Sequence, residues 1–350
     1  MKRDTRPFFS TGSMFFPAVT AAMLIATAIW LAQWNDSGAK YPVQATQSAG
    51  STTAVVPQMA QPSRIELQKV KVSSAAELER LFDSLDYTWP PQAGKTVPRI
   101  AVEAFPADLD RVGDSRQKKS LFFRALLPIV LAENDHVRQE RDYALHLLEN
   151  GVPEAGTPRR EWLDERLTRY RIRGSLEHKA VRDQLLQRLD VVPTSLALAQ
   201  AASESGWGMS RFAQQGNNLF GHVTSNASKG MVPTARPEGL THAMRTFPTV
   251  RESVRAYVSN LNTSRVYSEL WRLRERMRVT ASFLDPMPLA AGLMSYSVRG
   301  QDYIDDIRTI IRNNRLTTLL RHVDLRPELK LADAAELVAA SGKRHQSKDG

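Results

Sequence analysis

A carboxylate stands at the end of an apolar, helix-forming segment and is followed by two glycines that flank a tryptophan. The segment reads LALAQAASE, ends at Glu204 and continues into Ser205-Gly206-Trp207-Gly208. The helix macrodipole places partial negative charge at a helix's carboxyl end, and small apolar neighbours keep water away, so both effects disfavour an ionised Glu204. We therefore predict a raised pKa for Glu204, which suits a general acid working near neutral pH.

The residues that follow Glu204 suit a carbohydrate cleft when they are taken together. The candidates are one aromatic residue and three amides, Trp207, Gln214, Asn217 and Asn218. Taken singly, each has a plainer interpretation, with the tryptophan in the core, the amides in a turn, and Glu204 as a helix end paired with Arg211. Their combination with an acid of raised pKa favours a pocket that contacts sugar hydroxyl and acetamido groups.

The elements that must position these residues are mostly helices. Apolar residues recur at helical spacing in ten segments, at 74–85, 118–135, 135–149, 159–171, 176–189, 194–204, 250–262, 266–278, 287–296 and 303–313. We expect Thr194 or Ser195 to cap the helix that carries Glu204, Thr249 to open a capping box, and Pro128 to kink its helix. Alternating residues at 63–72 predict a short strand, and clustered turn residues at 222–248 predict a small β-hairpin. The sequence therefore predicts one mainly α domain with a single β insertion.

The N-terminal region has the pattern of an export or anchoring signal. Lys2, Arg3 and Arg6 precede an uncharged run at 14–34, close to the roughly 20 apolar residues that a membrane-spanning helix needs. Cationic residues stay on the cytoplasmic side, so we expect the rest of the chain outside the inner membrane. A cleaved signal peptide is the alternative, and both place the folded part in the periplasm of a cell with two membranes.

These patterns divide the chain as follows: a cytoplasmic N-terminus at 1–13, the membrane anchor or signal segment at 14–34, a flexible linker at 35–62, an N-terminal helical part at 63–190, a catalytic core at 191–328 and a disordered tail at 329–350.

Composition excludes several classes of chemistry. The chain of 350 residues has no cysteine, so it has no thiolate nucleophile, disulfide framework or cysteine-bound metal. Its 7 histidines have no metal-ligand spacing, and no nucleotide-binding glycine loop occurs. We expect no metal and no cofactor. The net charge of +10 favours an anionic partner, and the export signal argues against nucleic acid.

The stretch 199–221 resembles the signature of the bacterial β-N-acetylglucosaminidases that hydrolyse peptidoglycan. That family carries a Glu-Ser-x-Trp-Gly-x-Ser segment followed by Asn-Asn-Leu-Phe-Gly, and both are present here. The Bax-type group of Gram-negative bacteria is the most similar, with further likeness at 97–106 and 118–135. The resemblance implies a lysozyme-like α-lobe with a small β-hairpin lobe. It also implies hydrolysis of the bond between N-acetylglucosamine and N-acetylmuramic acid in peptidoglycan glycan strands, with Glu204 as the acid.

The resemblance also assigns further site residues. It places a second acid in the β-lobe, where Glu238 is the only carboxylate between the motif and the capping box. It carries a catalytic tyrosine onto Tyr296, although Arg299-Gly300-Gln301 replaces the family's Asp-Pro there. Phe220, in Asn-Asn-Leu-Phe-Gly, joins the predicted substrate-binding residues. We assign the two remaining tyrosines of this region, Tyr257 and Tyr303, to the core.

Two other functions remain open. A lytic transglycosylase uses a comparable Glu-Ser at a helix end, but there the downstream segment usually reads Gly-Leu-Met-Gln. A non-catalytic peptidoglycan-binding protein could keep the same fold. Retention of Glu204 within an intact motif favours the hydrolase.

Overall fold

The computed structural model describes residues 59–92, 96–226, 228, 230–232, 243–281 and 283–327. The predicted anchor at 14–34, the tail at 329–350 and Glu238 lie outside these residues. Every helix within the described part is too short or too polar to span a bilayer.

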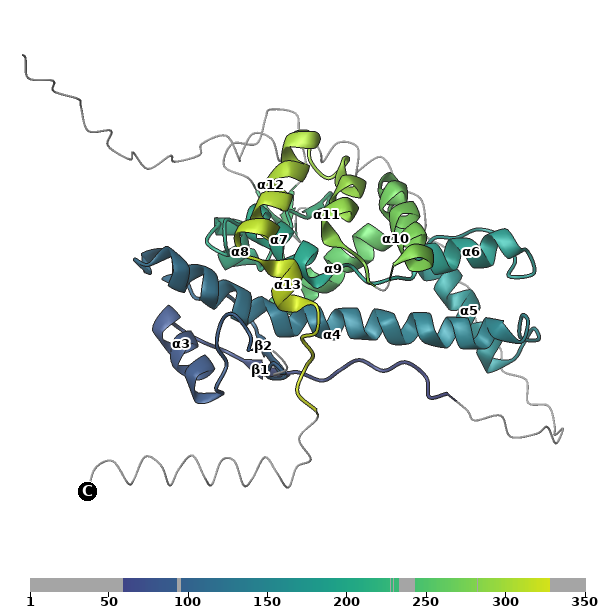
Figure 1. Ribbon diagram of the computed structural model, residues 1–350, viewed down its shortest axis with the longest axis horizontal. Coiled ribbons are helices and arrows are strands. Elements are labelled where there is room, and N and C mark those ends of the chain that lie inside the picture. The colour runs from purple at the N-terminus through teal and green to yellow at the C-terminus, as the bar shows by residue number, and fades with distance from the viewer. Residues whose placement is uncertain are drawn as a thin grey trace, which may run out of the picture.

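One long helix, α4 (Ser115–Glu149), runs through the molecule and separates two groups of elements (Figure 1). Our prediction of two helices, at 118–135 and 135–149, was wrong, because α4 continues without a break through residue 135, and Pro128 lies inside it. Its buried stripe extends past the proline to Tyr143 and Leu147. Packing along this stripe therefore outweighs the backbone hydrogen bond that Pro128 cannot donate.

The smaller group of elements lies on one side of α4. It contains α3 (Ala75–Ser84), the 3₁₀ turn η1 (Leu109–Arg111) and strands β1 (Gln68–Val70) and β2 (Ile100–Val102). β1 and β2 pair in parallel, with Gln68 opposite Ile100. The strand predicted within 63–72 is thus confirmed, while β2 was not predicted, because three buried apolar residues show no alternation.

The larger group lies on the opposite side of α4 (Figure 1). Its helices are α5 (Pro158–Arg169), α6 (Lys179–Arg188), α7 (Thr194–Ser205), α8 (Arg211–Gly216), α9 (Val250–Thr263), η3 (Arg265–Tyr267), α10 (Ser268–Thr280), α11 (Pro286–Leu289), η4 (Ala290–Leu293), α12 (Gln301–Asn313) and α13 (Leu316–Leu320). The predicted cap of α9 is confirmed, since the Thr249 side chain accepts a hydrogen bond from the Glu252 amide at 3.3 Å. The cap predicted at Thr194 or Ser195 was wrong, because Pro193 precedes α7 and offers no side-chain hydrogen bond.

A small antiparallel sheet follows the motif. It contains β3 (Val223–Thr224), β4 (Gly230–Met231) and β5 (Ala243–Arg245), in the spatial order β3-β5-β4. The expected hairpin is therefore part of a three-stranded sheet within the described residues. The predicted fold class is confirmed: the protein is mainly α, with one small β insertion directly after α7 and α8.

Candidate functional site

Helix α7 carries Glu204 into the middle of the larger group. It packs against α4 and α12, and its run of alanines is almost completely buried. Small side chains let three helices approach closely, since each alanine adds little width to the interface. The sequence LALAQAAS is therefore that of a central helix enclosed by its neighbours, and it ends where Glu204 can reach the space beside α12.

The chain leaves α7 through an unusual turn. Gly206, Trp207 and Gly208 all have left-handed backbones, with φ of 56°, 62° and 79°. Glycine adopts this conformation readily, whereas it is uncommon for a tryptophan. The Ser205 hydroxyl fixes the turn, because it donates to the Ala201 carbonyl at 2.6 Å and accepts from the Gly208 amide at 2.8 Å. Ser205 thus has a structural task.

Glu204 keeps part of its surface accessible although protein atoms surround it. Burial raises the pKa of Glu204 to about 7, against the opposing effects of a hydrogen bond from Tyr303 and the charge of Arg299. The predicted rise in pKa is confirmed. Arg211 does not pair with Glu204 in the described part of the chain; its guanidinium donates to the Val232 carbonyl at 2.8 Å.

Four tyrosines surround Glu204. They come from α9, η3, the segment after η4 and α12: Tyr257, Tyr267, Tyr296 and Tyr303. Burial raises the pKa values of Tyr257, Tyr296 and Tyr303. The Glu204 charge is the next cause at Tyr296 and Tyr303, whereas at Tyr257 it follows the effect of Tyr267. Their hydroxyls therefore stay neutral. They give Glu204 neutral polar neighbours, and the charge of Arg299 lowers its pKa by less than burial raises it.

A directed chain of hydrogen bonds leads to Glu204. Tyr257 donates to the Gln200 side-chain oxygen at 2.6 Å, and the Gln200 amide donates to the Tyr303 hydroxyl at 2.9 Å. A tyrosine hydroxyl has a single hydrogen. Since Tyr303 already accepts from Gln200, its hydrogen is free for the Glu204 carboxyl, with which it forms a hydrogen bond. Gln200 thereby fixes which way Tyr303 points.

Tyr296 and Phe220 form the wall beside this chain. The Tyr296 hydroxyl donates to the Phe220 carbonyl at 2.9 Å, and its ring stacks on Tyr303 with centroids 5.5 Å apart. The Phe220 ring stacks on Tyr257 at 3.9 Å. The structure therefore brings two predicted site residues, Tyr296 and Phe220, together around Glu204. Contact of either with substrate stays a prediction.

The motif amides make contacts within the protein. Both amide hydrogens of Asn218 are used, on the His222 and Arg245 carbonyls at 2.7 and 2.9 Å, so this side chain holds the small sheet. Asn217 donates to the Phe247 carbonyl at 3.1 Å, just before α9. These bonds explain why two adjacent asparagines follow α8, and their predicted contacts with sugar stay predictions.

Trp207 and Gln214 each keep part of the side chain accessible. The Trp207 ring meets Phe122 and Phe123 edge-on, at 5.7 and 5.3 Å, while Lys119 Nζ lies 4.8 Å from its centroid. Trp207 is only partly buried, so one part of the ring packs in the core and another part is accessible to solvent. Gln214 has one long contact, 3.4 Å to the Ala107 carbonyl, and is also partly exposed.

Sequence reasoning missed the hydrogen-bond chain. It assigned Tyr257 and Tyr303 to the core and gave Gln200 no role. Both tyrosines are buried, as expected, yet their hydroxyls lead to Glu204. One signal was present: Gln200 lies four residues before Glu204, so both occupy the same face of α7. A polar residue there, within an alanine-rich segment, marks the face turned toward the site.

Comparisons with known proteins agree with this geometry. Residues 180–316 match the model of the Glucosaminidase family, described as mannosyl-glycoprotein endo-beta-N-acetylglucosaminidase. The chain is also 30% identical over 209 residues to Protein bax of Escherichia coli (strain K12), an alignment that covers 59% of this chain and 74% of that protein. This chain belongs to the Bax-type glucosaminidase-domain proteins. No solved structure matches it.

The match to the Glucosaminidase family starts in α6 and ends at α13. It therefore contains Glu204, Gln200 and all four tyrosines around them. Membership of the Glucosaminidase family indicates glycosidase activity. The segment before residue 180, including all of α4, lies outside the family match but supplies the aromatic residues that pack against Trp207.

Proposed function

We propose that this protein hydrolyses the β-1,4 bond between N-acetylglucosamine and N-acetylmuramic acid in peptidoglycan, with Glu204 as the general acid. The observation that carries the proposal is the environment of Glu204. Its carboxyl, raised in pKa to about 7 by burial, is held by a neutral tyrosine in a family of glycosidases. An acid with this pKa holds a proton at neutral pH in about half of the molecules and releases it readily.

Proton transfer from Glu204 to the departing sugar oxygen would leave a carboxylate behind. The Tyr303 hydroxyl supports that charge with its hydrogen bond, and Gln200 keeps the hydroxyl aimed at Glu204. Because the donors are already in place, little reorganisation accompanies the transfer. We further propose Glu238 as the second carboxyl of the pair that most glycosidases use, with Tyr296 beside the reacting bond.

We propose that Trp207 and Gln214 bind the glycan through the surfaces they leave accessible, with Asn217, Asn218 and Phe220 as the supporting wall. Peptidoglycan also suits the compartment that the sequence indicates. We accordingly propose a periplasmic site of action, with attachment to the inner membrane through residues 14–34 unless a signal peptidase removes them.

Product analysis after digestion of purified peptidoglycan tests the proposal. We expect fragments with N-acetylglucosamine at the reducing end, identified by mass spectrometry after borohydride reduction. The Glu204→Gln variant should lose activity by about 10²- to 10⁴-fold, the usual contribution of a general acid. Glu269→Gln is a matched control, because Glu269 is half-exposed and pairs only with Arg272 and Arg276 in the described part.

Three outcomes would contradict the proposal. Equal release of fragments by the wild type and Glu204→Gln would remove Glu204 from the chemistry. Products with anhydro-muramyl ends would assign the protein to the lytic transglycosylases. If neither protein released fragments but both bound peptidoglycan, a non-catalytic wall-binding role would replace the enzyme.

A further inference from the structure

A second polar pocket lies away from Glu204. Side chains from α4, α5, α9 and the segment before β1 line it, among them Arg64, Arg169 and Arg255. Arg255 and Ser259 contribute from α9, whereas Tyr257 of the same helix faces Glu204. Since residues two apart point to nearly opposite sides of a helix, α9 separates this pocket from the candidate active site.

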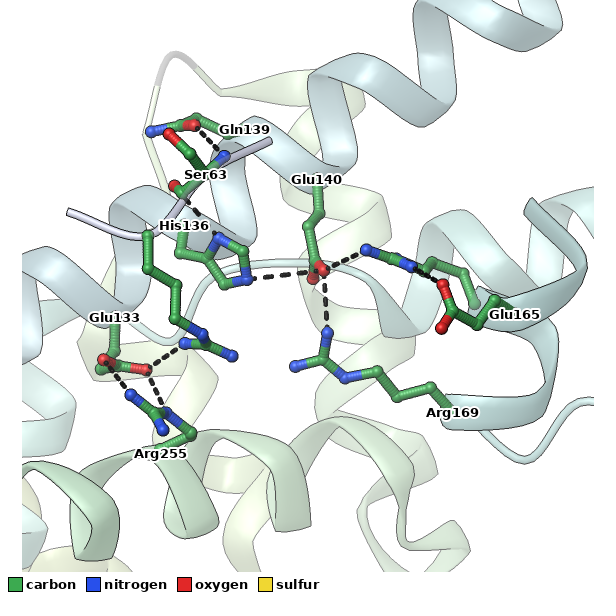
Figure 2. Close-up of polar contacts among 10 residues, drawn as sticks. Ser63, Glu133, His136, Gln139, Glu140, Glu165, Arg169 and Arg255 are labelled. Atoms are coloured by element: carbon green, nitrogen blue, oxygen red, sulfur yellow. Dashed lines mark hydrogen bonds and ion pairs between the residues drawn. The ribbon is translucent and has the colours of Figure 1, made fainter. Parts of the chain in front are cut away.

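Two buried glutamates of α4 organise the pocket. Glu133 accepts hydrogen bonds from Arg64 at 2.8 Å and Arg251 at 2.7 Å, and a third from Arg255 at 3.1 Å. Glu140 accepts from two arginines of α5, Arg166 at 3.0 Å and Arg169 at 2.8 Å. Figure 2 shows the two clusters side by side with His136 between them.

Positive charge exceeds negative charge in this network. Five arginines meet only three carboxylates, the third being Glu165, which pairs with Arg166 at 2.6 Å. Burial lowers the pKa of Arg64, and the charges of Arg255 and Arg169 lower it further against the effect of Glu133. The guanidinium groups are therefore close enough to repel one another, and an anion between them would relieve that repulsion.

Hydrogen-bond donors remain unused around the pocket. Arg64 and Arg169 each use one terminal nitrogen on a glutamate, although a guanidinium carries five N–H donors. Ser259 and Thr263 also line the pocket, and within the described part of the chain their hydroxyls have no recorded hydrogen bond. The space measures about 340 Å³, including its opening to solvent. Its enclosed part is only about the size of a water molecule, so an anion would bind at the solvent-facing mouth of the pocket.

We propose that this pocket is a binding site for a doubly charged oxyanion of the phosphate type, held by Arg64, Arg169 and Arg255 with Ser259 and Thr263 as neutral donors. A dianion matches the surplus of two positive charges, and planar guanidinium groups bind phosphate oxygens in pairs. The phosphate is either a free ion or a monoester carried by a larger molecule. Because Arg64 belongs to the segment before β1, the bound anion would also hold that segment against α4.

Calorimetric titration of the full-length protein with sodium phosphate tests the site, at pH 7 and at an ionic strength held constant with sodium chloride. We expect one phosphate per chain and at least tenfold weaker binding in both Arg169→Gln and Arg255→Gln. Arg272→Gln is the matched control. It removes a mostly exposed arginine of α10 that pairs with Glu269, so its affinity for phosphate should equal that of the wild type.

A second variant separates the site from general stability. Ser259→Ala keeps every ion pair of the network, and we expect a three- to fivefold loss of affinity with an unchanged circular dichroism spectrum. Phenyl phosphate distinguishes the sources: binding as tight as that of inorganic phosphate indicates a monoester, and failure to bind indicates the free ion. The proposal is overturned if phosphate gives no saturable heat at millimolar concentration, or if Arg169→Gln and Arg272→Gln bind it equally well.

Discussion

Glu204 and Glu133 are both surrounded by protein atoms, but their hydrogen-bond partners differ in charge. Burial is the largest influence on both, and by itself it would raise both pKa values. At Glu133, hydrogen bonds from Arg255 and Arg251 outweigh burial and lower the pKa. At Glu204 the partner is the neutral Tyr303, and the pKa rises to about 7.

The difference lies in which residues supply the hydrogen bonds. Arginines stabilise only the ionised form and therefore fix Glu133 as a permanent anion that joins helices. Tyrosines can bond to both the protonated and the ionised carboxyl, so Glu204 can change state without losing its neighbours. We infer that the tyrosines around Glu204 provide the reversibility that acid catalysis needs, while the arginines around Glu133 provide cohesion.

The strongest test of this comparison removes the charge that the arginines surround. Glu133→Gln should lower the free energy of unfolding by about 3–5 kcal/mol at pH 7, because three partly exposed guanidinium groups lose the buried carboxylate that they share. Urea denaturation followed by circular dichroism measures the change. Glu269→Gln, which breaks two exposed pairs, should cost less than about 1 kcal/mol. Equal costs for both variants would mean that Glu133 is solvated like a surface residue.

Much of the fold was predictable because its helices are strongly patterned. The segments that became α3, α9 and α12 have apolar residues at clear helical spacing, and their predicted bounds fall within a few residues of the observed ones. The prediction failed where packing joins two patterned segments, since α4 continues without a break through the boundary predicted at residue 135. It also missed β2, whose pairing with β1 joins residues far apart in the sequence.

The candidate site was predictable only in part. Glu204 and its raised pKa followed from the end of one apolar helix, which is local information. The partners of Glu204 come from α9, η3 and α12. No spacing in the sequence predicts that Gln200 would form hydrogen bonds with both Tyr257 and Tyr303. Their apolar flanks made them look like core residues. Burial was therefore predicted correctly, and the direction of each hydroxyl was not.

A second test substitutes Glu204, and here we expect the variant to gain stability, whereas Glu133→Gln should lose it. A carboxyl whose pKa is raised on folding keeps its proton in the native state while the unfolded chain has already released it, so stability falls as pH rises from about 4.5 to 7. Glu204→Gln cannot ionise and should be more stable than the wild type above pH 7, by about 1–3 kcal/mol. The difference should vanish below pH 4.

Denaturation curves of the two proteins at pH 4 and pH 8 measure this gain. Glu269→Gln, which changes an exposed carboxylate, should show no comparable gain at pH 8. A Glu204→Gln variant less stable than the wild type at pH 8 would place the carboxylate among favourable partners, like Glu133, and would end the contrast between the two sites.

The test with the smallest expected effect concerns the hydrogen bond from Tyr303, which lowers the pKa that burial raises at Glu204. Tyr303→Phe removes the donor that favours the ionised carboxyl, so the pKa of Glu204 should rise further. Activity that depends on protonated Glu204 falls as pH rises through this pKa, so the basic limb of kcat/KM, near pH 7 in the wild type, should move upward. A hydrogen bond to a charged group suggests a shift of about one pH unit.

Tyr143→Phe is the control for Tyr303→Phe. It removes a buried phenol hydroxyl that packs beside Trp162, away from Glu204, and should leave the limb in place. A limb that stays near pH 7 in Tyr303→Phe would mean that Tyr303 does not stabilise the carboxylate. Gln200→Leu then tests whether the orientation of the hydroxyl matters, because the Tyr303 hydroxyl remains but no longer accepts a hydrogen bond from Gln200. We expect this variant to shift the limb in the same direction as Tyr303→Phe, but by less.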